Sequence, residues 1–234
     1  MSKSRKRVNG YSLVELLVAT VLFTIVAGTV FSLLLSAQLR YRGESDVTTA
    51  FQQANVAIDQ ITRDVHSAGY PPANSFAGPP ALPPDPGSVA IPFSWSLGSG
   101  YPTTQCTVNG TCGAIPGGND LILETDPGDG NGVQWIRYSL QGTTLMRGMT
   151  PKIAFQDPVA STGGSLIPYL ENVQNGSLPI FSYCYDGTGC SAVAGPVSNI
   201  REVNVTLIVQ SAQPDPQTGQ FRTITLTGQA TRFN

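Results

Sequence analysis

Residues 10–35 read GYSLVELLVATVLFTIVAGTVFSLLL, and this stretch decides the architecture of the chain. From Tyr11 to Leu35 nearly every residue is apolar or small, and Glu15 carries the only charge. A stretch of this length is long enough for a membrane-spanning helix, for which about 20 residues suffice. An ionised carboxylate inside hydrocarbon is costly, so Glu15 is by default a candidate functional residue.

The residues in front of this stretch are basic, with Lys3, Arg5, Lys6 and Arg7 among the first ten. Cations beside a membrane helix stay on the cytoplasmic side, so the sequence predicts that everything after the helix lies outside. Without the first ten residues, nine basic side chains remain against 15 acidic ones, a side-chain charge of −6. Only 12% of all residues are charged, which favours an exported protein over a cytosolic enzyme. A nucleic-acid-binding surface is not expected.

Three ordinary kinds of N-terminal segment fit less well. A secretory signal peptide has a shorter apolar region, followed by a cleavage site flanked by small residues. A plain signal anchor accounts for the length and the orientation but leaves Glu15 unexplained. A lipoprotein anchor needs a cysteine near the start of the chain, and the first one is Cys106.

The order of basic leader, Gly10, Tyr11, Glu15 and apolar run resembles the class III signal of type IV prepilins and pseudopilins. The resemblance implies that a prepilin peptidase cleaves between Gly10 and Tyr11 and then methylates the new amine of Tyr11. Glu15 becomes the fifth residue of the mature chain, as the family requires, and Tyr11 keeps the aromatic character of the usual phenylalanine. The amine of Tyr11, on this or a neighbouring subunit, would neutralise Glu15 and set the axial register between subunits. Alternatively, Glu15 is a boundary residue whose carboxylate reaches the membrane surface.

The helix is expected to continue beyond the membrane, because no proline precedes Pro71 and all 18 follow from there. We divide it into a transmembrane and assembly half, residues 11–37, and an amphipathic half, residues 38–69. Gly28 and Gly43 are the places where it could bend. The predicted apolar stripe should pack against a sheet of the same chain, although a coiled-coil seam has the same spacing. It consists of Val47, Phe51, Ala54, Ile58, Ile61, Val65 and Ala68.

The end of the helix also resembles a known group. Residues 57–65, followed by Ala68-Gly69-Tyr70, are similar to the helix end of PilW-type minor pilins. Gly69 suits a helix cap, and the prolines that follow cannot continue a helix. Arg63 and Asp64 are interpreted as part of a solvated face, so that this motif marks the fold rather than a chemical site.

Residues 70–118 are rich in proline, glycine and serine, and we interpret them as an irregular surface elaboration. The four cysteines form two pairs, Cys106 with Cys112 and Cys184 with Cys190. Neither pair has the C-x-x-C spacing, and a zinc site would require both pairs to meet in space. Two local disulfides, formed in an oxidising compartment, are the preferred interpretation.

Residues 119–234 show strand patterns and are predicted to form a β-rich head. The fold class is therefore α+β, with a long N-terminal helix packed on an antiparallel sheet, as in pilins. Two hairpins are expected, one around the turn at residues 126–132 and one around residues 213–219. The predicted strands are residues 120–125, 133–138, 144–147, 178–185, 203–209 and 221–226.

An enzyme is not predicted. The single histidine, His66, lies on the expected helix, and no nucleophile elbow, phosphate loop or dinucleotide fingerprint is present. The spacing of Asp126, Asp129 and Asn131 is reminiscent of a calcium loop, but the full EF-hand pattern is missing and a hairpin turn explains the same residues. No catalytic residue, cofactor or metal site is therefore assigned.

These expectations combine into one functional hypothesis. A PilW-like minor pilin would wait in the inner membrane as a single-pass protein with a periplasmic head, and would then enter a type IV pilus, or fimbrium, at the cell surface. Its partners would be the prepilin peptidase, other minor pilins, the major pilin, the inner-membrane assembly platform and membrane lipid. The alternatives are a J-type pseudopilin of type II secretion and a membrane-anchored binding module that never enters a fibre.

Overall fold

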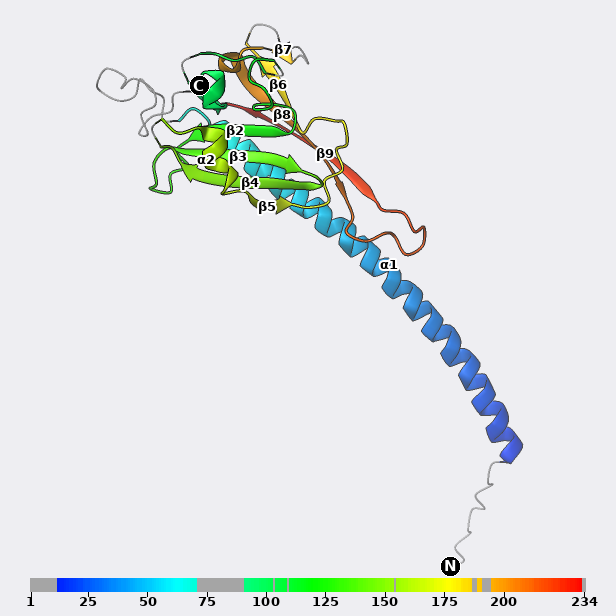
Figure 1. Cartoon of the computed structure of the whole chain (residues 1–234). Coiled ribbons are helices and arrows are strands. Elements are labelled where there is room, and N and C mark those ends of the chain that lie inside the picture. Colours follow the sequence, from blue (N-terminus) through cyan, green and yellow to red (C-terminus); the bar gives the residue numbers. More distant parts are fainter. Residues whose placement is uncertain are drawn as a thin grey trace, which may run out of the picture.

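A computed structural model describes residues 12–70, 91–102, 104–108, 110–153, 155–186, 189–190 and 195–232. One long helix carries a head made of two antiparallel sheets (Figure 1). The elements in chain order are α1 (Leu13–Ser67), β1 (Phe93–Ser94), η2 (Leu97–Ser99), β2 (Asp120–Thr125), β3 (Gln134–Gln141), β4 (Thr144–Pro151), α2 (Pro158–Gly163), β5 (Ile167–Leu170), β6 (Phe181–Tyr185), β7 (Gly189–Cys190), η3 (Val197–Asn199), β8 (Ile200–Gln210) and β9 (Thr223–Thr231).

Helix α1 has 55 residues, which corresponds to about 82 Å at 1.5 Å per residue. It remains helical through both Gly28 and Gly43, the two glycines at which the sequence allows a bend. Figure 1 shows that its first half projects away from the head, whereas its second half lies against the sheets. The predicted long helix and α+β fold class are confirmed.

The sheets are built from the predicted hairpins. A five-stranded sheet has the order β1-β2-β3-β4-β5, and a four-stranded sheet has the order β7-β6-β8-β9. Every pairing within both sheets is antiparallel, and the two predicted hairpins are β2–β3 and β8–β9. Strand β5 and helix α2 were not predicted from the sequence. The head thus contains two sheets where a single one was expected.

Both sheets pack on the second half of α1. The stripe was predicted nearly correctly, but Phe51 is 45% exposed and Val47 is only partly buried. Ala50 and Ala57 are buried in their place, because small residues allow the strands to approach the helix closely. The closest approach is at Gly228 of β9, where an added Cβ would overlap Ile58 Cγ2. The buried face of α1 consists of Ala50, Ala54, Ala57, Ile58, Ile61, Asp64 and Val65.

The interpretation of residues 70–118 as a surface elaboration is wrong for much of its described part. Residues 71–90 lie outside the described residues, but Phe93 and Trp95 are fully buried. Strand β1 extends the five-stranded sheet beside β2, and the ring of Tyr101 packs edge-on against Trp95 at 5.4 Å. Aromatic side chains contribute large apolar areas to a core, and this segment supplies several of them.

Candidate functional site: the N-terminal helix and its junction with the head

The start of α1 is capped by its own side chains. Ser12 is the N-cap residue, and its Oγ accepts a hydrogen bond from the Val14 backbone N–H at 3.4 Å. Glu15 reaches back, so that its Oε2 accepts the Ser12 backbone N–H at 3.1 Å. This reciprocal arrangement is a capping box, which satisfies two helix N–H groups that would otherwise lack partners. The carboxylate of Glu15 therefore lies at the very beginning of the helix, beside the backbone of Ser12.

The first half of α1 is exposed along its whole described length. Every residue from Ser12 to Arg42 is exposed, including large apolar side chains such as Phe23 and Phe31. Among the described residues, α1 is the one helix long and apolar enough to cross a membrane. Burying one large apolar side chain is favourable by about 1.5–3 kcal/mol relative to leaving it in water. The exposed apolar half of α1 therefore requires lipid or other helices around it.

The comparisons with known proteins address this same segment. Residues 5–31 match the family model described as the prokaryotic N-terminal methylation motif. The motif is typical of type IV pilins and pseudopilins, which are structural rather than enzymatic proteins. No curated protein and no solved structure matches the chain significantly. The N-methylation motif and the exposed apolar helix together indicate a pilin-like or pseudopilin-like protein anchored in a membrane.

The motif covers three of the predicted site residues, of which only Glu15 has a described position. Gly10 and Tyr11, the expected cleavage and N-methylation site, lie outside the described residues. Their roles therefore remain predictions. The short distance between Glu15 and the Ser12 N–H adds one fact that the sequence pattern did not contain, namely that the carboxylate points back along the chain.

A second polar cluster joins the end of α1 to the five-stranded sheet. Asp64 is buried, with 6% of its surface exposed, so the expectation of a solvated face is wrong for this residue. The Tyr138 hydroxyl donates a hydrogen bond to Asp64 Oδ2 at 2.5 Å, and Arg147 forms an ion pair with the same oxygen at 2.9 Å. Gln60 donates to Asp64 Oδ1 at 2.8 Å. Both carboxylate oxygens are therefore occupied, as the burial of a charge requires.

Sequence reasoning missed this cluster because its members are far apart in the chain. Arg147 and Tyr138 lie 83 and 74 residues from Asp64. Burial raises the pKa of Tyr138 well above its usual value, and the negative charge of Asp64 raises it further. The hydroxyl thus stays protonated and remains a donor. One signal was present: Asp64 follows Ile61 by three residues and Ala57 by seven, which places it on the buried face.

The head contains another buried ion pair, between Glu124 of β2 and Lys152. Both side chains are fully buried, and Lys152 Nζ lies 2.9 Å from Glu124 Oε2. The other carboxylate oxygen accepts hydrogen bonds from the Trp135 indole at 3.0 Å and from Ser94 at 2.9 Å. These contacts join β1, β2, β3 and the end of β4, and we assign them a structural role.

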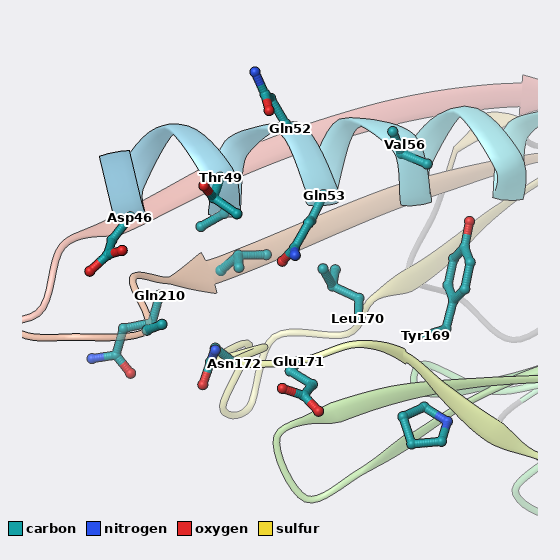
Figure 2. Close-up of a pocket in the computed structure, with 14 residues that line it drawn as sticks. Asp46, Thr49, Gln52, Gln53, Val56, Tyr169, Leu170, Glu171, Asn172 and Gln210 are labelled. Carbon is teal, nitrogen blue, oxygen red and sulfur yellow. The ribbon is translucent and has the colours of Figure 1, made fainter. Parts of the chain in front are cut away.

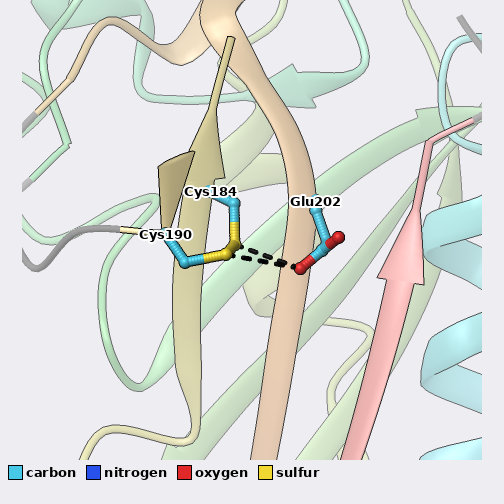
Figure 3. Close-up of side chains that lie close together, drawn as sticks. All are labelled: Cys184, Cys190 and Glu202. Atoms are coloured by element: carbon cyan, nitrogen blue, oxygen red, sulfur yellow. Dashed lines mark hydrogen bonds between the residues drawn. A yellow bond between two sulfur atoms is a disulfide. The ribbon is translucent and has the colours of Figure 1, made fainter. Parts of the chain in front are cut away.

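Both cysteine pairs form disulfides, Cys106–Cys112 and Cys184–Cys190. Figure 3 shows Glu202 beside the second one, with Oε1 3.1 Å from Cys184 Sγ and 3.6 Å from Cys190 Sγ. These three side chains, Cys184, Cys190 and Glu202, could hold a metal ion if the cysteines were thiolates. In the disulfide the sulfurs are bonded to each other, so this cluster is not a metal site in the oxidised protein.

The turn that resembles a calcium loop is held by its own hydrogen bonds. Asp129 accepts the Asn131 backbone N–H at 3.0 Å and the Gln134 side chain at 2.8 and 2.9 Å. These bonds, above all the one from the Asn131 backbone, lower the pKa of Asp129. Asp126 Oδ1 likewise accepts the Gly128 N–H at 2.8 Å. The aspartates thus close the β2–β3 turn, which favours the hairpin interpretation over the calcium loop.

Proposed function

We propose that this chain is a PilW-like minor pilin that helps to initiate a type IV pilus and is incorporated into it. Prepilin peptidase would cleave between Gly10 and Tyr11 and methylate the new amine. The observation that carries the proposal is the N-methylation motif on a helix whose apolar half is exposed on all sides. Before assembly the helix would lie in the inner membrane with the head in the periplasm, since the basic leader stays cytoplasmic.

The position of Glu15 supports a charge pair with the mature N-terminus. Its Oε2 already lies 3.1 Å from the Ser12 N–H, and cleavage would create a cationic amine on the preceding residue. An unpaired carboxylate in hydrocarbon is strongly unfavourable, whereas the amine of Tyr11 or of a neighbouring subunit would neutralise it. The subunit would then leave the lipid when helices of other pilins cover its apolar surface.

The first experiment tests processing. In cells without active prepilin peptidase, the chain should keep residues 1–10, and in normal cells mass spectrometry should find a mature chain that begins with N-methylated Tyr11. A mature chain that begins at any other residue would rule out the proposal. Partners that co-purify with the processed chain would distinguish a pilus from a type II secretion system, because the motif is typical of both pilins and pseudopilins.

The second experiment separates helix capping from charge pairing at Glu15. Glu15→Gln keeps a side chain that can complete the capping box but removes the charge. Ser12→Ala removes the cap and keeps the charge. Charge pairing predicts that Glu15→Gln abolishes assembly while Ser12→Ala is tolerated. If the chain is instead a membrane-anchored binding module outside any fibre, neither change should affect its function.

A further inference from the structure

A groove runs between α1 and the edge of the head, just beyond the exposed half of the helix. It has a volume of about 550 Å³ and is lined by α1 from Asp46 to Val56, by the segment from Pro168 to Asn172, and by the end of β8. Figure 2 shows α1 along one side of the groove and Leu170 and Glu171 along the other. Strand β5 pairs with β4 on one edge only, so its other edge has no described strand beside it.

The floor of the groove is apolar and its rim is polar. Ala50, Leu170 and Val209 are buried at 7%, 2% and 1% exposure, and they form the floor. Thr49, Gln53 and Gln210 bring polar groups to the rim (Figure 2). A long side chain with an apolar stem and a polar tip fits this combination, because the stem covers the floor while the tip stays at the rim.

The charge of the groove is entirely negative. Its lining contains two acids, Asp46 and Glu171, and no lysine, arginine or histidine. Within the described part of the chain neither carboxylate has an ion pair or a side-chain hydrogen bond. By contrast, the neighbouring β8–β9 loop is internally neutralised, since Asp215 is paired with Arg222. The groove therefore complements a cation.

The location of the groove decides between the possible cations. Asp46 lies 11 residues beyond Leu35, about 16 Å along the helix axis, whereas the headgroup layer is only about 5–8 Å thick. A lipid headgroup therefore lies too close to the membrane to reach the groove. A calcium site would need further oxygen ligands gathered between the two carboxylates to reach six to eight, and the floor between them is apolar. A protein segment is the remaining source, and the helix surface that neighbouring subunits would cover continues directly into the groove wall.

We propose that this groove binds an extended segment of a neighbouring pilin-type subunit, with a lysine or arginine side chain lying over Ala50, Leu170 and Val209 and its charge between Asp46 and Glu171. This inference rests on the proposed function, because it takes the neighbouring subunit from it. Charge complementarity of this kind contributes to the choice and register of partners more than to raw affinity.

The test is photo-cross-linking in cells that express the full-length chain. A photoreactive phenylalanine analogue replaces Gln53, which is exposed on the groove wall. We expect one cross-linked product, whose partner peptide comes from a chain with the same kind of N-terminal motif and contains a lysine or arginine. Asp46→Lys combined with Glu171→Lys should reduce the yield of this product at least about tenfold. Asp46→Asn alone and Glu171→Gln alone, which neutralise one charge each, should reduce it about two- to fivefold. Asp59→Lys is the matched control, since Asp59 is an exposed acid of α1 outside the groove.

Three results would overturn the inference: no product at Gln53 from chains already in the fibre, a yield unaffected by the double reversal, or a partner peptide without a basic residue. The N-terminus of the same samples is sequenced in parallel. A chain that begins at Tyr11 and enters the fibre without a groove contact refutes the groove alone. A chain with a different mature N-terminus refutes the proposed function.

Discussion

Replacing Arg147 by methionine should lower the free energy of unfolding of the head by about 3–5 kcal/mol. The substitution leaves the Asp64 carboxylate in place, with 6% of its surface exposed and its positive partner removed. Tyr138 and Gln60 would still donate to it, but neither carries a charge. For a chain of this size each kcal/mol corresponds to about 2–4 °C, so the melting temperature should fall by about 6–20 °C.

A double-mutant cycle isolates the pair from other effects. Asp64→Asn leaves the Arg147 side chain, which is 20% exposed, so it should cost less, about 2–3 kcal/mol. The double variant should recover part of the loss, giving a coupling energy of about 2 kcal/mol. The matched control is Asp186→Asn, which breaks an ion pair whose side chains are 68% and 48% exposed and should cost under about 1 kcal/mol.

The assay is thermal or urea unfolding of the full chain in detergent, followed by tryptophan fluorescence. Trp95 and Trp135 are both fully buried in the head, so the signal reports on the head. A coupling energy below about 0.5 kcal/mol would refute the reasoning, because it would mean that Asp64 and Arg147 do not depend on each other. An equal loss in Asp186→Asn would have the same consequence.

Three further predictions concern the same head. Gly228→Ala should destabilise it by about 1–3 kcal/mol in the same unfolding assay, because the new Cβ overlaps Ile58, whereas Gly163→Ala, with open space around it, should be nearly neutral. Burial raises the pKa of Tyr138 above that of an unfolded tyrosine, so its contribution to stability is complete below about pH 10 and is lost above it, by about 1.4 kcal/mol per pH unit. Tyr138→Phe should therefore flatten the fall in stability between about pH 10 and 11. Replacing both cysteines of the Cys106–Cys112 disulfide by serine should lower the free energy of unfolding by about 2 kcal/mol. The melting temperature of the variant, compared with that of the oxidised parent protein, will show the loss.

Much of the fold could be predicted because the relevant signals are local. An uninterrupted apolar run, the absence of proline before Pro71 and the turn residues between alternating strands each depend on neighbours in the sequence. Helix α1 and the two hairpins follow from them. Phe51 belongs to the predicted buried stripe but is exposed in the structure, because an apolar residue at helical spacing does not always face the sheet. In the structure the neighbouring Ala50 takes that place, since the strands lie close to the helix.

The polar interior was not predictable in the same way. A charged residue at the end of a helix is usually solvated, and only its tertiary partners make burial possible. For Asp64 those partners are Tyr138 on β3 and Arg147 on β4, so a prediction would have required the pairing of these strands and their position against α1. Strand β5 has only four residues, and one of them is Pro168, which weakens a strand pattern in the sequence.

The buried carboxylate also explains how the head keeps one position on the helix. The stripe on α1 includes Ala50, Ala54 and Ala57, and similar small residues repeat about once per turn. The packing of these alanines changes little when the helix shifts by one turn, about 5.4 Å, along the sheets. Asp64 breaks this near-repeat, because its Oδ2 meets Tyr138 and Arg147 of the five-stranded sheet in one register only. After a shift the carboxylate would keep Gln60, which lies on the same helix, but would be buried without its positive partner, at a cost of several kcal/mol. If the helix is drawn out of a membrane, as proposed, the pull acts along the direction of such a shift. The ion pair then opposes the shift together with the close fit of Ile58 against Gly228.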